Sequence, residues 1–238
     1  MPRKARIVVP NTPHHIVQRG HNKQVVFVSD DDYQYYLENV FEWKEQLNCK
    51  VYAWCLMTNH IHLIINPGNE VDNLGKLMKR LAGKQTRYVN RLEKRTGSLW
   101  EGRYKSSPIE TDAYLLACCR YVELNPVRAR MVEKPEEYHW SSYQEKIGLK
   151  EQDKMDTDAC YLSLGETQEQ RIARYKQWVE SEVSEQEIKS IREAMQRGHP
   201  TGSPLFTEVI EKKLDIRLSL NKPGRPRKQI NKRGGVIL

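Results

Sequence analysis

Two apolar runs, KVYAWCLM at residues 50–57 and HIHLII at residues 60–65, constrain the fold more than any other feature of the sequence. Only Thr58 and Asn59 separate them. A two-residue connection between strand-like runs is typical of a tight β-hairpin. Pro67 and Gly68 end the second run. The chain is therefore expected to contain an antiparallel sheet.

The segments around this hairpin predict the rest of the sheet. Residues 14–19 are rich in β-branched side chains and residues 100–109 alternate in polarity, so both are expected to be strands. The spacing of apolar residues predicts helices over 33–47, 71–94 and 112–125, the last of which Pro126 ends. This order predicts a ferredoxin-like α+β fold, an antiparallel sheet with helices on one face.

The sequence suggests three parts. The core domain is expected to span residues 1–148. Residues 149–218 predict an accessory region in which three short helices, one of them opened by a capping box at Ser184-x-x-Glu187, form a small bundle. Residues 219–238 form a tail whose stretch NKPGRPRKQINKR holds six basic residues and no acids. Such a tail is expected to be disordered until it binds a partner.

Composition narrows the functional class. The formal net charge is +8 and the pI is about 9.2, which favours a polyanionic partner such as nucleic acid. The five cysteines form no Cys-x-x-Cys pair, so neither a disulfide framework nor a zinc knuckle is expected. No apolar run reaches the length of about 18 residues that a membrane helix needs. We expect a cytoplasmic, nucleoid-associated protein with no membrane partner.

The helix expected over 71–94 carries a one-sided row of cations, here called the basic stripe: Lys76, Arg80, Lys84, Arg87 and Arg91. A solvated helix face normally mixes charges of both signs, so the stripe is better explained by contact with a phosphate backbone. Arg103 and Lys105 would extend this surface. Arg225 and Arg227 in the tail fit the minor groove of A/T-rich DNA, although a generic basic tail explains them equally well.

Two further patterns carry chemistry. His60 and His62 lie two apart on a strand, so both face one side, where they could bind one metal ion, while Ile61 and the following apolar residues face the core. The plain alternative is a pair of surface histidines. Tyr121 and Asn125 lie four apart on a helix and would share its rim, and each alone could be an ordinary rim residue.

Together these residues carry a family resemblance. The segments PHHIVQRG, LMTNHIHLIINP, GSLWEGRYKSS and YLLACCRYVELNPVRARMV resemble the single-tyrosine HUH transposases, and more closely the REP-associated tyrosine transposases. The ending GRPRK is typical of longer members. The resemblance covers most of residues 1–145.

The resemblance implies roles for specific residues. His60 and His62 match the paired metal-binding histidines, Tyr121 matches the nucleophile, and Asn125 matches the position that completes the metal site, where related enzymes have Gln. It implies Mg²⁺ or Mn²⁺ as cofactor and single-stranded DNA folded into palindromic hairpins as partner. The activity that the resemblance implies is that of a single-strand DNA endonuclease and strand transferase, which works through a 5′-phosphotyrosine intermediate.

Two other readings stay open on the sequence. A zinc hydrolase built on His60 and His62 would need a third histidine or a carboxylate as ligand. The spacing of the other histidines in the sequence does not indicate which residue that would be. A non-catalytic DNA-binding regulator derived from a transposase would need only the basic stripe and the tail. The sequence does not indicate the DNA site, the oligomeric state, or whether Tyr121 acts in its own chain or a partner's.

Overall fold

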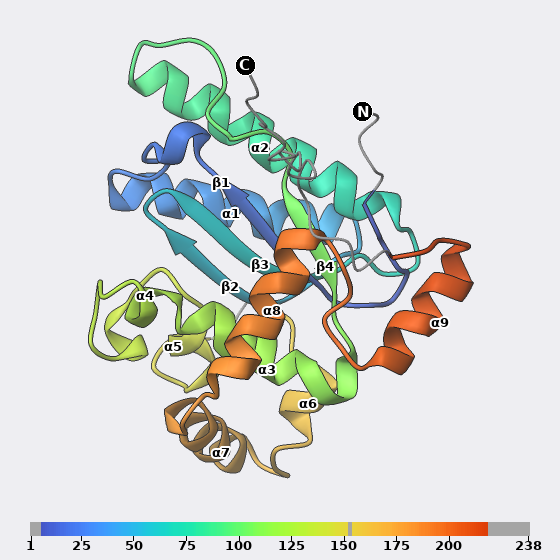
Figure 1. Ribbon diagram of the computed structural model, residues 1–238. Helices are drawn as coiled ribbons and strands as arrows, with labels where there is room; N and C mark the ends of the chain where they lie inside the picture. The colour runs from blue at the N-terminus through green and yellow to red at the C-terminus, as the bar shows by residue number, and fades with distance from the viewer. Residues whose placement is uncertain (1–5, 152–153, 219–238) are drawn as a thin grey trace, which may run out of the picture.

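The computed structural model describes residues 6–151 and 154–218. Its sheet is antiparallel, with the strand order β2-β3-β1-β4 (Figure 1). The strands are β1 (His14–Arg19), β2 (Lys50–Met57), β3 (His60–Asn66) and β4 (Lys105–Pro108), with α1 (Asp30–Gln46) between β1 and β2 and α2 (Asp72–Leu92) between β3 and β4. This is the predicted connectivity, so the ferredoxin-like α+β fold class is confirmed.

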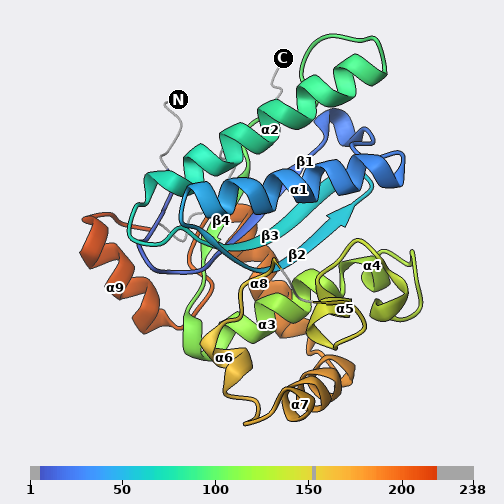
Figure 2. The ribbon, with the colours of Figure 1, turned by 180° about the vertical axis from the view of Figure 1, so that it is seen from behind.

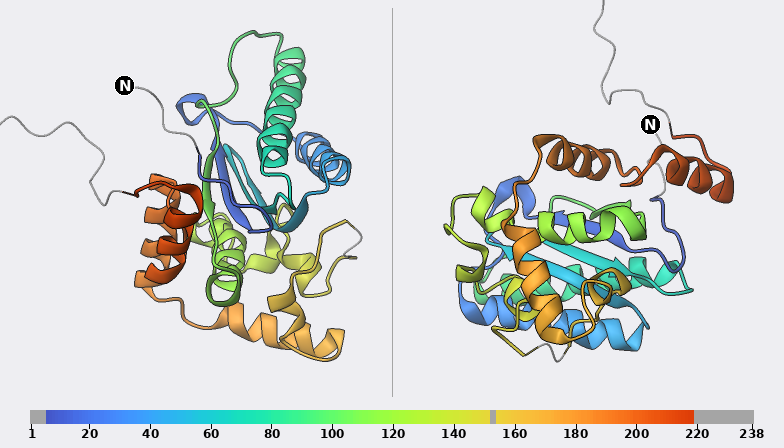
Figure 3. Two further views of the ribbon diagram at one scale, coloured as in Figure 1. Left: turned by 90° about the vertical axis from the view of Figure 1, so that its right-hand side faces the viewer. Right: turned by 90° about the horizontal axis from the view of Figure 1, so that it is seen from below.

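Different helices cover the two faces of the sheet (Figures 2 and 3). On one face α1 and α2 bury Leu63 and Ile65 in one apolar cluster. On the other face Cys55 and Ile64 share a second cluster with α3 (Thr111–Glu123) and α8 (Glu185–Arg197). The predicted one-sided arrangement therefore describes α1 and α2. The second face also needs a cover because its own side chains are apolar and would otherwise be exposed.

Two predicted boundaries change. The strand expected over 100–109 is only β4, because Gly102 takes a positive φ of 89° and turns the chain, leaving Trp100 in an isolated bridge with Gly20. The helix expected over 112–125 ends at Glu123, and α4 (Asn125–Arg128) follows after Leu124. Pro126 explains this break, because proline lacks an N–H and is favoured in the first turn of a helix.

The accessory region packs on the core instead of forming the expected bundle. The remaining helices are η1 (His21–Lys23), η2 (Pro135–Glu137), α5 (Tyr143–Lys146), α6 (Ala159–Leu162), α7 (Gln168–Glu180) and α9 (Pro204–Leu214). Ile191 of α8 joins the cluster over the sheet, Tyr175 of α7 packs on Tyr143, and Ile210 of α9 packs on Ile7. Each apolar stripe thus meets a different part of the core. Among the described residues, no helix combines the length and hydropathy needed to cross a membrane.

Candidate active site

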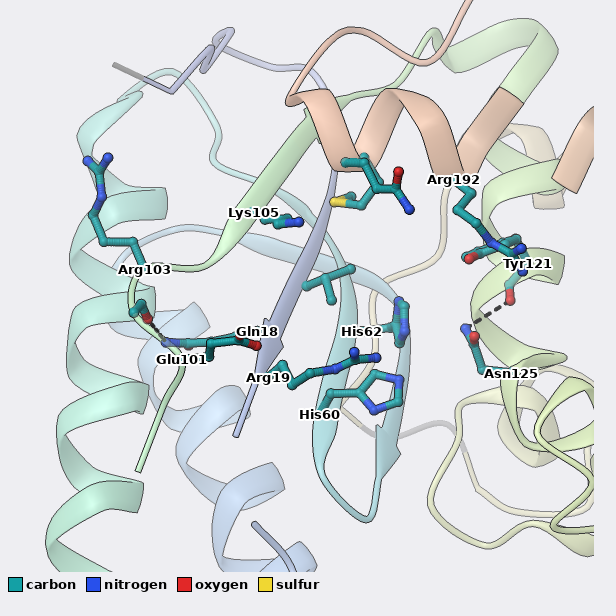
Figure 4. A pocket seen from close by; sticks show the side chains of 14 residues that line it. Gln18, Arg19, His60, His62, Glu101, Arg103, Lys105, Tyr121, Asn125 and Arg192 are labelled. Carbon is teal, nitrogen blue, oxygen red and sulfur yellow. Dashed lines mark hydrogen bonds between the residues drawn. The ribbon is translucent and has the colours of Figure 1, made fainter. Parts of the chain in front are cut away.

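A pocket of about 540 Å³ opens on the face of the sheet covered by α3 and α8 (Figure 4). Its walls come from β1, β3, the segment before β4, α3, α4 and α8. The predicted site residues that line it are His60, His62, Tyr121, Asn125, Arg103 and Lys105. The fold therefore brings together side chains that lie more than 60 residues apart in sequence.

His60 and His62 project from β3 toward this pocket, with ring centroids 5.1 Å apart. Asn59 Nδ2 donates to the Lys23 carbonyl at 3.1 Å, so Asn59 Oδ1 is the acceptor that lies 2.7 Å from His60 Nδ1. The proton of neutral His60 is therefore on Nδ1. This leaves the lone pair on Nε2, which is the atom able to bind a metal.

Burial keeps both imidazoles uncharged at neutral pH. Together with a smaller contribution from the nearby Arg19 guanidinium, it lowers the pKa of His60 to about 4. Burial also holds the pKa of His62 well below its ordinary value, with His15 and His60 adding to the effect. A neutral imidazole is the form that binds metals, so burial favours the protonation state that a metal ligand requires.

Tyr121 of α3 lies beside this pair in the same chain. Its ring centroid is 6.2 Å from that of His62. The Arg128 guanidinium stacks over the Tyr121 ring at 4.2 Å from the centroid, and Arg128 Nη2 also donates to the Tyr121 carbonyl. Arg128 thus contacts the tyrosine through both ring and backbone, and restricts how that residue can move.

Arg120 and Glu123, two neighbours of Tyr121 on α3, make hydrogen bonds to later parts of the chain. Arg120 is 2% exposed and makes two hydrogen bonds to the Glu187 carboxylate of α8, at 2.8 and 3.0 Å. Glu123 is fully buried and accepts hydrogen bonds from Ser142 Oγ and Tyr175 OH, both at 2.6 Å. Charge-assisted hydrogen bonds of this kind are strong and directional, so the accessory region helps to fix the end of α3 that carries Tyr121.

Asn125 lies at the start of α4, on the pocket wall. Its Nδ2 donates to the carbonyls of Tyr121 and Val122, both at 3.0 Å, which identifies Oδ1 as the atom that can act as a ligand. Among the described residues no group of three or more His, Cys, Asp and Glu side chains is placed to hold a metal. The available donors are two imidazole nitrogens and one amide oxygen, a set that suits a divalent ion and leaves its charge uncancelled.

Basic side chains outnumber acidic ones on the pocket wall, where Glu101 is the one carboxylate among the lining residues. Arg19, Arg103, Lys105 and Arg192 all line it. The nearby Arg192 lowers the pKa of Arg128, although burial has the larger effect in the same direction. Guanidinium and ammonium groups are the side chains that most often bind phosphate in proteins.

The basic stripe lies on the other side of the sheet, because α2 packs on the face opposite to the histidines (Figure 3). Arg80 stacks on Trp43 at 4.2 Å from a ring centroid, and Lys84 pairs with Glu42 at 3.8 Å, so part of the stripe contacts α1. Lys76, Arg87 and Arg91 are exposed. Arg225 and Arg227 lie outside the described residues.

Sequence reasoning did not single out four residues of this site. Arg19 and His15 share a strand face with Val17, and their alternation along β1 is a signal that was available. Arg128 lies one turn beyond the predicted helix end. Arg192 reaches the pocket only because α8 docks there, and no local pattern indicates that.

Comparisons with known proteins concern the family and the fold. Residues 8–125 match the family model described as "Transposase IS200 like". A solved structure of a REP-associated tyrosine transposase bound to a REP hairpin superposes with a TM-score of 0.55, at 15% identity, over 62% of this chain and 86% of that one.

A second structure, of a putative transposase from Deinococcus radiodurans, gives a TM-score of 0.36 at 17% identity over 55% of this chain and 92% of that one. A search of curated protein sequences finds no match. The matched segment begins before β1 and ends at Asn125, so it contains the sheet, both pocket histidines and Tyr121. The chain belongs to the family of IS200-like transposases, which are DNA-cleaving enzymes.

Proposed function

We propose that this protein cleaves and rejoins single-stranded DNA that contains hairpins, with Tyr121 as the nucleophile. The observation that carries the proposal is the position of the Tyr121 ring, 6.2 Å from that of His62, in a pocket lined with cations. Because this contact lies within one chain, the proposal includes catalysis in cis.

The proposed reaction is the one that the family resemblance implies, with Tyr121 in the role of the nucleophile. The Tyr121 oxygen attacks the scissile phosphorus, a P–O bond forms to the tyrosine, the bond to the 3′ oxygen breaks, and a proton that replaces the one lost by the phenol is taken up by that 3′ oxygen. The products are a 5′-phosphotyrosine link and a free 3′-OH. Since the link keeps the energy of a phosphodiester, a different 3′-OH can reverse the attack and join new ends. Arg19 and Arg192 would bind the phosphate while Arg128 holds the tyrosine in position.

A divalent ion of the Mg²⁺ or Mn²⁺ type fits the donors of this site. His60 Nε2, His62 Nε2 and Asn125 Oδ1 would hold it. When bound, it would supply Lewis-acid stabilisation of the charge that develops on the phosphate. The depressed pKa values of His60 and His62 support this role, because no proton has to be removed before they bind the ion.

The REP-associated transposase with the similar fold is bound to a REP hairpin. We propose a partner of the same kind here, a hairpin whose single-stranded flank enters the pocket. Arg103 and Lys105 would hold that flank, and the exposed cations of the basic stripe, with Arg225 and Arg227, would contact other parts of the DNA backbone.

The test is the detection of a covalent complex. A single-stranded hairpin DNA, labelled at its 3′ end because the fragment downstream of the cut stays attached, is incubated with the protein and Mn²⁺ and run on a denaturing gel. We expect a slowly migrating species that disappears in Tyr121→Phe, while Tyr121→Phe still retards the DNA on a native gel. Tyr114→Phe, on the same helix, should keep the adduct.

Two results would contradict the proposal. An undiminished adduct in Tyr121→Phe would move the nucleophile elsewhere. DNA retardation without any adduct, indifferent to metal and to Tyr121, would indicate a transposase-derived DNA-binding regulator.

A further inference from the structure

His15 of β1 contacts two residues of the pocket, His62 and Tyr121. It is fully buried, and it faces the same side of the sheet as His62, because the register pairs His15 with Ile64 and His62 with Val17. The two rings lie 5.2 Å apart, and His15 Nε2 is 2.9 Å from His62 Nδ1. This is hydrogen-bond distance between two nitrogens, so one proton must lie between them.

That proton has two possible positions with opposite consequences for His62. If it is on His62 Nδ1, His15 accepts it and His62 Nε2 has a free lone pair. If it is on His15 Nε2, then neutral His62 must carry its own proton on Nε2 and cannot bind a metal with that atom. The hydrogen bond inside the protein therefore decides whether the nitrogen that remains for the pocket is a ligand or a donor.

In two neighbouring histidines, hydrogen bonds define which ring nitrogen carries the proton. His14 is equally buried, yet its Nδ1 lies 2.7 Å from the Thr12 carbonyl and its Nε2 accepts from the Val9 N–H at 3.2 Å, so its tautomer is defined. His60 is defined by Asn59 Oδ1. Among the described residues, His15 Nδ1 has no hydrogen-bond partner, so this atom is buried and unpaired in either tautomer and does not define the position of the proton.

We propose that His15 is a positioning residue that accepts the Nδ1–H of His62 and thereby keeps the His62 Nε2 lone pair directed into the pocket. This inference rests on the proposed function, because it gives His62 its role as a ligand. Partners of this kind usually orient a metal-binding histidine, and they are often carboxylates. A neutral imidazole can accept the same proton without adding negative charge that would weaken the attraction between the ion and the DNA phosphate.

Two substitutions separate the acceptor from the bulk of the side chain. In His15→Gln the amide oxygen lies near the place of Nε2 and can accept the same proton. In His15→Leu no acceptor remains. As matched controls, His14→Gln and His14→Leu alter an equally buried histidine on the same strand that does not contact His62.

The first measurement is Mn²⁺ binding to the full-length protein by calorimetry, without DNA. His15→Leu should bind Mn²⁺ about 10- to 100-fold more weakly than wild type, as expected for loss of such a partner. His15→Gln should stay within a few fold, and both His14 variants should match wild type. Equal affinity in His15→Leu and wild type would overturn the proposal.

The second measurement reads the tautomer itself. Long-range ¹H–¹⁵N correlation spectra of the metal-free protein should show His62 protonated on Nδ1 in wild type and in His15→Gln, and a shift toward the Nε2–H form in His15→Leu. A wild-type His62 protonated on Nε2 would also overturn it. A general loss of folding moves all ring signals at once, so the spectra distinguish it from a change confined to His62.

The outcomes also separate this inference from the proposed function. If wild type forms the covalent adduct and binds Mn²⁺ but His15→Leu binds it equally well, only the role of His15 fails. If wild type binds no Mn²⁺, the metal-dependent function fails and the role of His15 fails with it.

Discussion

On the side of α1 and α2 the sheet presents Leu63 and Ile65, which are fully buried in an apolar cluster. On the side of α3 and α8 the same strands present His15 and His62, also buried, next to Cys55 and Ile64. Alternation along β3 thus divides one strand between two tasks. The first face stabilises the fold by burying apolar side chains. The second face buries polar side chains, which need hydrogen-bond partners.

The buried polar groups on the second face need hydrogen-bond partners, and several of these partners come from distant parts of the chain. A buried polar group without a hydrogen bond is costly, so His62 is paired with His15, and Arg120 with Glu187. The Glu187 contact comes from α8, a helix that also brings Arg192 to the pocket. The accessory region is therefore part of the wall of this site.

The two faces of β3 can be tested with substitutions of two adjacent residues, His62 and Leu63. The larger effect is expected for His62. His62→Ala should lower the yield of covalent adduct by more than about 100-fold at every Mg²⁺ or Mn²⁺ concentration, because a metal site supplies several kcal/mol of transition-state stabilisation. The measurement is the denaturing-gel assay at saturating DNA. His139→Ala, which alters an exposed histidine that does not line the pocket, is the control and should keep full activity. Undiminished adduct in His62→Ala would remove the metal site from the mechanism.

Leu63→Ala should have the opposite profile. Leu63 is fully buried against α1 and α2, so its truncation should cost about 2–5 kcal/mol of unfolding free energy in urea denaturation. The adduct formed per folded molecule should stay close to wild type, because the side chain points away from the pocket. A loss of adduct in protein that is still folded would show that the two faces are coupled.

This division also explains what the sequence could reveal. Two apolar runs with two residues between them predict the hairpin, and β2 and β3 form at these runs. The α8 boundaries follow from local signals, since the Ser184 side chain accepts from the Glu187 N–H and Gly198 takes a left-handed conformation. His60 and His62 were recognised because strand alternation is a local rule, and the family match supports the resemblance that singled out Tyr121.

Contacts that depend on the register between strands, or on how a distant helix packs on the core, could not be predicted from local sequence patterns. The partnership of His15 with His62 exists only because β1 pairs with β3 in one particular register. Arg192 reaches the pocket because Arg120 and Glu187 meet, 67 residues apart in sequence. The turn at Gly102, which shortens the last strand, results from a φ angle that the polarity pattern of residues 100–109 does not encode.

A pH titration of stability can test the buried histidines without any substrate. Burial lowers the pKa of His14 from 6.5 to about 4 in the folded protein. As pH falls below 6.5 the unfolded chain takes up this proton first, so unfolding free energy should decrease down to about pH 4. The His14 contribution is about 3 kcal/mol. Urea unfolding of His14→Gln should show a correspondingly shallower loss, and an identical pH slope in the variant would contradict the buried, neutral state of His14.

The smallest effect concerns the outer surface of α2, on the face remote from Tyr121. Arg87 is exposed there, and its replacement by Ala should reduce the slope of log binding constant against log salt by about one, as for a single lost phosphate contact. Lys212→Ala, on α9, is the matched control and should leave the slope unchanged. Adduct formation at saturating DNA should be normal in both variants, because neither residue lines the pocket. If Arg87→Ala leaves the salt dependence unchanged as well, DNA does not contact this part of α2, and the cations around Tyr121 and the tail would have to account for the binding.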